Sequence, residues 1–114
     1  LAQTPKEEII PFFRAGGEVY GGLCFADSHR PFFRTLDVGY YMNTGSVGNS
    51  MGVPRAHFLL LEGEMDSREP APLLATVVTV PYDNQAAAQL AREDPNLPHR
   101  DAYITEVLTG VYSR

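Results

Sequence analysis

A strand-like aromatic segment that ends at an asparagine and a glycine constrains this chain more than any other feature. Residues 40–42 are Tyr-Tyr-Met, and residues 43–48 follow at once as Asn-Thr-Gly-Ser-Val-Gly. Gly45 tolerates a positive φ, while Asn43 and Ser46 carry short side chains that hydrogen-bond neighbouring backbone. The pattern predicts a strand that ends in a tight loop, which is where α/β proteins usually place functional groups.

A second informative segment precedes this loop. Residues 26–31 read Ala-Asp-Ser-His-Arg-Pro and follow a predicted strand over 18–25. Asp27 and His29 carry donor groups that bind divalent metals, and the guanidinium of Arg30 suits oxyanions. By themselves these residues are equally typical of an ordinary turn carboxylate, a loop histidine and a solvated arginine.

Together the two segments resemble the last signature of the calcineurin-like metallophosphoesterases, in the order typical of the small bacterial and archaeal branch. In that family a strand ends in Gly-His-Thr-His, and a short hairpin leads to Asn-x-Gly-Ser-Val-Gly and a Pro-Arg pair. Here Ala-Asp-Ser-His (26–29), Asn-Thr-Gly-Ser-Val-Gly (43–48) and Pro-Arg (54–55) stand in the same order. The resemblance covers nearly the whole chain from about Glu18 onward.

The resemblance implies hydrolysis of a phosphomonoester or phosphodiester with two divalent metals such as Mn, Fe or Zn. By position, His29 matches the second histidine of the signature and is the expected metal ligand. Asp27 stands where the family has the first histidine and is the second ligand candidate. Arg30 is expected to contact the phosphate of a phosphorylated small molecule or phosphoprotein. The loop residues expected to support the site are Asn43, Gly45 and Ser46.

The amino-terminal signatures of the family have no counterpart here: there is no Asp-x-His at a first strand, no Gly-Asp-x-x-Asp and no Gly-Asn-His. Those segments supply most of the metal ligands, so the chain resembles the carboxy-terminal half of the enzyme. We therefore expect no metal on this chain alone and a partner that is either the missing half or another chain. The start at Leu1 rather than Met fits a chain that begins within a longer protein.

Two other readings stay open at this point. Asp27 in place of a histidine also fits a non-catalytic relative that serves as a scaffold or oligomerisation module. A small α+β ligand-binding domain with an accidental motif is the third reading.

Composition narrows the function classes. With 114 residues, the chain (1–114) is one domain or part of one. A net charge of −5 argues against binding to a nucleic-acid backbone, and no apolar run approaches the ~18 residues of a membrane span.

The single Cys24 makes no internal disulfide and suits the cytoplasm; we expect it to be a small buried residue. His57 is expected on a sheet face or in the core with its polar atoms satisfied, and His99 in solvent.

The predicted fold class is α+β, and the resemblance implies part of a layered α/β/β/α sandwich, one sheet with flanking helices. A first helix begins after a Thr4 cap and ends at the glycines 16–17. Strands are predicted over 18–25, 32–36, 38–42, 56–61 and 73–80. A helix over 84–93 capped by Asp83 or Asn84 follows, and then a short helix capped by Asp101 and ended by Gly110. The strands 56–61 and 73–80 are almost wholly apolar, so we expect burial on both faces, partly by another chain.

Overall fold

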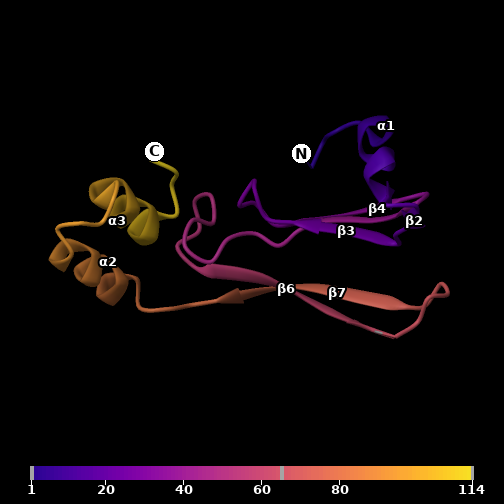
Figure 1. The fold of residues 1–114 in the computed structure, drawn as a ribbon. Coiled ribbons are helices and arrows are strands. Elements are labelled where there is room, and N and C mark those ends of the chain that lie inside the picture. Colours follow the sequence, from indigo (N-terminus) through magenta and orange to yellow (C-terminus); the bar gives the residue numbers. More distant parts are fainter. Residues whose placement is uncertain (1, 65, 114) are drawn as a thin grey trace.

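The computed structural model describes residues 2–64 and 66–113, and this part of the chain is a small α+β unit (Figure 1). In chain order the elements are α1 (Lys6–Ile9), the 3₁₀ helix η1 (Ile10–Phe13), β1 (Arg14–Ala15), β2 (Glu18–Val19), β3 (Gly22–Phe25), β4 (Phe32–Leu36), β5 (Gly39–Asn43), β6 (Ala56–Gly63), β7 (Leu73–Val80), α2 (Asn84–Glu93) and α3 (Arg100–Thr109). The α+β class is therefore confirmed.

The first helix is shorter than predicted. Pro5, not Thr4, occupies the N-cap of α1, and no side chain caps its free backbone amides. Pro11 cannot donate to an α-helical ladder, so the helix continues only as the 3₁₀ turn η1. The two glycines at 16–17 do not end a helix; both have positive φ and form the turn between β1 and β2.

A three-stranded sheet with the order β3-β5-β4 is the centre of the fold. The predicted strand 18–25 is broken, since the backbone amide of Tyr20 donates to Phe13 instead of to a neighbouring strand. β3 then runs parallel to β5, with Phe25 opposite Asn43. Strands β4 and β5 form the predicted hairpin. At its turn, a Cβ on Gly39 would collide with the carbonyl oxygen of Gly21, so this close approach requires glycine.

The hydrophobic core lies between this sheet and the amino-terminal helices. Ile9, Phe13 and Tyr41 are buried and are packed by partly buried neighbours. The rings of Phe25 and Phe32 meet edge to face at 5.6 Å, and Tyr41 lies 4.8 Å from Phe25. These contacts fix the strand ends that carry residues 26–29 and 43–48.

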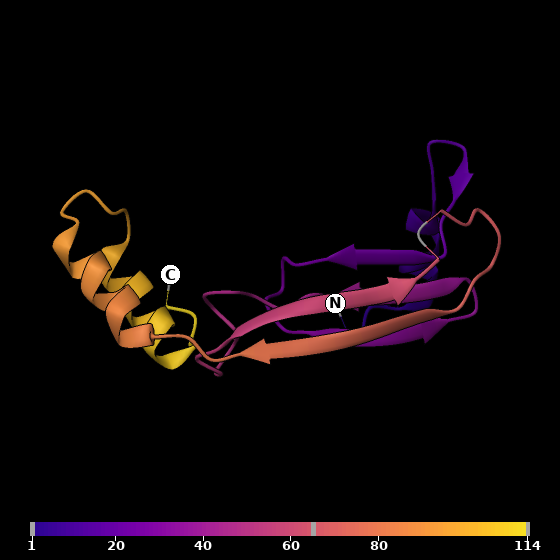
Figure 2. The same ribbon diagram turned by 90° about the horizontal axis from the view of Figure 1, so that it is seen from below.

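Strands β6 and β7 form a separate antiparallel hairpin, so the expectation of a single sheet is wrong. The hairpin runs alongside the three-stranded sheet as a second layer, which both views show (Figures 1 and 2). No strand of the described residues bridges the two layers by hydrogen bonds. The pairs His57–Thr79 and Leu59–Val77 define one face of the hairpin. His57 is buried there against the loop that follows β5.

The opposite face of this hairpin is apolar and open. Phe58 is 45% exposed, Leu60 44%, Leu74 59% and Val80 38%; we call these four residues the Phe58 face. The prediction that both faces of these strands are buried is therefore wrong for this chain by itself. The physical reason is that the helices lie beyond the end of the hairpin and not over it (Figures 1 and 2).

The helix pair α2–α3 follows the hairpin. Asp83 caps α2 as predicted, accepting a hydrogen bond from the amide of Ala86 at 2.9 Å. Helix α3 begins one residue before the predicted cap, because His99 in the left-handed conformation precedes Arg100. Asn84 donates to the carbonyl oxygens of Pro54 and Val107, which ties both helices to the loop before β6. Within the described residues, no helix has the length and apolar character needed to cross a membrane.

The molecule is extended for its length. Its Cα radius of gyration is 17.3 Å and its principal extents are 51 × 27 × 23 Å, whereas a compact domain of 100 residues has a radius of about 13 Å. The open Phe58 face and the projecting helix pair account for this shape.

We expect the purified protein to self-associate when no other partner is present, because the Phe58 face exposes four large apolar side chains. Leu60→Lys introduces a charge into that face and should shift the protein toward the monomer in light scattering. Leu90→Lys is the matched control, since Leu90 is 69% exposed on α2, away from the hairpin. A wild-type protein that is monomeric and fully stable would contradict this expectation.

Candidate functional site

The two motif segments lie together at one end of the three-stranded sheet. Because β3 and β5 are parallel neighbours, the turn after Phe25 and the loop after Asn43 start from the same sheet edge. The amide of Thr44 donates to the carbonyl oxygen of Phe25 at 2.9 Å, which extends the pairing past the strand ends. The accidental-motif reading would have gained from a wide separation of these segments, and the structure brings them into contact.

A buried asparagine side chain joins the turn to the loop. Asn43 has no exposed surface, and its Oδ1 accepts from the amide of Gly45 at 2.8 Å. Its Nδ2 donates to Oγ of Ser28 at 3.0 Å. The backbone amide of Gly45 can only donate, so it fixes which end of the Asn43 side chain is the carbonyl. The Asn43 side chain is therefore bonded to a residue fifteen positions earlier in the sequence.

Ser46 organises the rest of the loop. Its carbonyl oxygen accepts from the amide of His57 at 2.8 Å and from Oγ of Ser50 at 2.8 Å, and its Oγ accepts from the amide of Asn49 at 3.0 Å. The expectation that short side chains bond neighbouring backbone is thus confirmed for Asn43 and Ser46. Gly45 has φ of +82°, and a Cβ there would lie 2.7 Å from Cβ of His57, so the loop packs tightly on β6.

The turn at residues 26–29 presents the two ligand candidates. His29 is partly buried in the left-handed conformation, with φ of 57°, and its amide donates to Ala26 O at 3.4 Å. A positive φ at a non-glycine residue is costly and is concentrated at functional sites. Asp27 is exposed, and its carboxylate lies near the phenol of Tyr41. Burial first, and then this carboxylate, raise the pKa of Tyr41, while Arg34 lowers it.

The donor set of this turn fits part of a metal site and not a complete one. An imidazole and a carboxylate are suitable donors for Mn, Fe or Zn. However, the residues at 2–64 and 66–113 contain no cluster of three or more histidine, cysteine, aspartate or glutamate side chains that could hold an ion. Asp27 and His29 would therefore be a minority of the ligands of any ion at this position.

The same loop contains buried polar atoms without partners. Nδ2 and Oδ1 of Asn49 and Nδ1 of His57 are buried and make no hydrogen bond within the described part of the chain. Our expectation of a fully satisfied histidine is therefore wrong, although His57 is buried as predicted. Each such group costs about 1–3 kcal/mol in the folded state.

A hollow of about 420 Å³ lies beside the turn. Its lining comes from the amino-terminal segment, the turn, the start of β4 and the loop after β5: Ala2, Gln3, Ser28, Arg30, Phe32 and Met51. Arg30 is exposed and faces this hollow, as its proposed substrate role requires. Asp27 and His29 are not among its lining residues.

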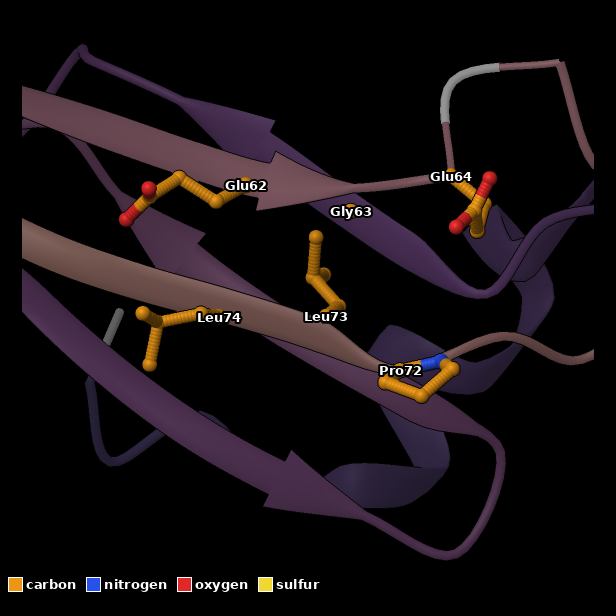
Figure 3. Close-up of a pocket in the computed structure, with 6 residues that line it drawn as sticks. All are labelled: Glu62, Gly63, Glu64, Pro72, Leu73 and Leu74. Atoms are coloured by element: carbon orange, nitrogen blue, oxygen red, sulfur yellow. The ribbon is translucent and has the colours of Figure 1, made fainter.

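A second hollow, of about 320 Å³, lies at the tip of the β6–β7 hairpin (Figure 3). It is lined by Leu73, Leu74 and Pro72, together with Gly63 and two glutamates. The carboxylates of Glu62 and Glu64 point away from each other in Figure 3, so they do not converge on a common ligand.

Sequence reasoning missed most of the residues around the first hollow. Ser28, Phe32 and Met51 were not singled out, and only their nearness to Asn43 and Arg30 in the sequence could have indicated them. Cys24 was expected to be buried but is exposed on β3, because β3 is an edge strand. Partial burial still raises the pKa of its thiol. His99 is exposed, as predicted.

Comparison with known protein families, with curated proteins and with solved structures finds no match to this chain.

The loop after β5 gives a direct stability prediction. Gly45→Ala should destabilise the protein by about 2 kcal/mol, because the new Cβ meets His57 and the positive φ is unfavourable for alanine. Chemical denaturation measures this free energy. Gly48→Ala is the matched control in the same loop, since a Cβ at Gly48 meets nothing within 4 Å. Equal stability of the two variants would show that the loop is not packed as described.

The raised pKa of Tyr41 predicts how the free energy of unfolding changes at alkaline pH. Its phenol keeps its proton to a higher pH in the folded state than in the unfolded state. The stability it contributes is complete below the unfolded pKa of about 10 and is lost as pH rises through the folded pKa.

Tyr41→Phe should therefore lose less stability between pH 9 and 11 than the wild type, as measured by denaturation at each pH. Some dependence should persist, because burial also raises the pKa of Tyr82 and of Cys24. Tyr112→Phe, at a 54% exposed position, is the control. An unchanged pH dependence in Tyr41→Phe would contradict the environment described for this phenol.

Proposed function

We propose that this chain supplies the carboxy-terminal half of a metal-dependent phosphoesterase that hydrolyses a phosphomonoester or phosphodiester. The observation that carries the proposal is the hydrogen bond between Asn43 and Ser28, which joins the two segments of the family-like signature at one sheet edge. A rigid strand end with an open turn is a suitable place for metal ligands and substrate contacts.

Within the proposed site, Asp27 and His29 would hold one side of a Mn, Fe or Zn ion. Such ions, when bound, lower the pKa of water and stabilise the charge that develops on phosphate oxygens. His29 ends the turn in the left-handed conformation. Asn43, Gly45 and Ser46 keep that turn in place, and Arg30 offers a guanidinium to the phosphate from the neighbouring hollow.

The other ligands and the general acid would come from a second polypeptide segment, either the amino-terminal half of the same protein or another chain. The Phe58 face supports this, because four large apolar side chains there are between 38% and 59% exposed. The packing of the β6–β7 hairpin along the three-stranded sheet is compatible with part of an α/β/β/α sandwich whose remaining layer covers that face (Figures 1 and 2). A cytoplasmic location belongs to the same proposal.

The alternative is a non-catalytic, metallophosphoesterase-like scaffold or oligomerisation module. One observation favours it: Asp27 is exposed and stands where the family has a histidine. A shorter carboxylate in that position changes both the charge and the reach of the ligand.

Metal analysis of the protein purified with its natural partner separates these functions. The enzyme reading predicts stoichiometric metal and hydrolysis of p-nitrophenyl phosphate. His29→Asn should lower the metal content and reduce kcat/KM by at least about a hundredfold. His99→Asn is the matched control, because His99 is an exposed histidine in the left-handed conformation like His29 but lies before α3.

Three results would count against the proposal. Absence of metal and of hydrolysis in the complete assembly would favour the scaffold. Full activity of His29→Asn would remove this turn from the site. Binding of two manganese ions by the 114-residue chain alone, with hydrolysis, would contradict the division of the ligands between two segments.

A further inference from the structure

The hydroxyl group of Ser28 is oriented by its partner. Asn43 Oδ1 already accepts from Gly45, so Nδ2 is the end that faces Ser28 and donates to its Oγ. Ser28 therefore acts as the acceptor in this hydrogen bond, and its own O–H proton remains to be donated elsewhere. No acceptor for that proton is found among residues 2–64 and 66–113, while Ser28 lines the hollow of about 420 Å³.

Arg30 brings positive charge to the same hollow. It is exposed, and no carboxylate within the described part of the chain forms an ion pair with it. Asp27, the nearest acidic residue in sequence, does not line the hollow. An O–H donor and an unpaired guanidinium in one concave surface form a site for an oxyanion, and phosphate matches the forked donors of arginine.

The lining of the hollow also includes large apolar side chains. Phe32 and Met51 contribute to its lining. The ring of Phe32 is held in place by Phe25 at 5.6 Å and by Tyr41 at 5.4 Å, so the lining includes an aromatic ring of fixed position. Met51 is 39% exposed and carries a polarisable thioether that packs well on aromatic rings.

We propose that this hollow binds a phosphate ester whose alcohol part is aromatic. The phosphate would accept hydrogen bonds from Ser28 and Arg30, and the aromatic group would lie against Phe32 and Met51. The volume of about 420 Å³ suits a ligand of that size. The inference rests on the proposed phosphoesterase and names the substrate class of the same site.

Binding in the absence of metal tests this without any turnover. Calorimetric titration of the 114-residue protein in a chelator should give phenyl phosphate an affinity at least about fivefold higher than that of glycerol 3-phosphate. Arg30→Gln should weaken both ligands by about tenfold, because a charge-assisted bond is lost. Arg92→Gln, an exposed arginine on α2, is the control and should bind like the wild type.

Two further variants test the contact between the hollow and the aromatic group of the ligand. Met51→Gln keeps the length of an exposed side chain but makes it polar, so it should remove the preference for phenyl phosphate and leave the affinity for glycerol 3-phosphate unchanged. Phe32→Leu should do the same, but Phe32 also packs against the core, and its folding must be checked by circular dichroism.

Equal affinities for phenyl phosphate and glycerol 3-phosphate in the wild type would overturn the inference, as would unchanged binding by Arg30→Gln. The two levels of the proposal fail separately. Selective binding of phenyl phosphate, with no hydrolysis by the complete assembly, would uphold the hollow and refute the enzyme. Hydrolysis by the assembly with no aromatic preference in binding would uphold the enzyme and refute the assignment of this hollow.

Discussion

The buried side chain of Asn43 is the constraint on which the candidate site depends. It is the last residue of β5. Its side chain accepts a hydrogen bond from Gly45 in the loop that follows and donates one to Ser28 in the turn after β3. A buried amide must find partners for its donor and its acceptor, and an orphaned group would cost about 1–3 kcal/mol. These partners lie on two different segments, so the hydrogen bonds that satisfy the amide also bring the two segments of the candidate site together.

Under the proposed function, the missing metal ligands and the open Phe58 face have the same explanation. The turn at residues 26–29 carries two candidate metal ligands, and the described residues contain no cluster of three donors. One face of the neighbouring hairpin exposes apolar residues. Hydrophobic burial would bring a second polypeptide onto the hairpin. The same event could deliver the remaining ligands to the turn, so association and chemistry would be coupled.

Local rules in the sequence predicted the local structure well. The Asp83 cap of α2, the bounds of β7 and the hydrogen bond from Gly45 to Asn43 follow from propensities that act over a few residues. Properties set by tertiary structure were not predictable in this way. The strand expected over 18–25 breaks because Tyr20 bonds to Phe13, and Cys24 is exposed because β3 is an edge strand. The apolar pattern of β6 and β7 predicted burial on both faces, but in this structure large side chains of the hairpin, such as Phe58 and Leu74, are exposed.

In the proposed function, the turn carrying Asp27 and His29 supplies a minority of the ligands of a metal site. A structure of the protein bound to its natural partner, with metal identified by anomalous scattering, tests this most directly. The account predicts an ion bonded to the imidazole of His29, with the other donors supplied from outside these residues and the Phe58 face covered. A His29 ring directed into solvent, with no ion beside it in the active assembly, would contradict the account.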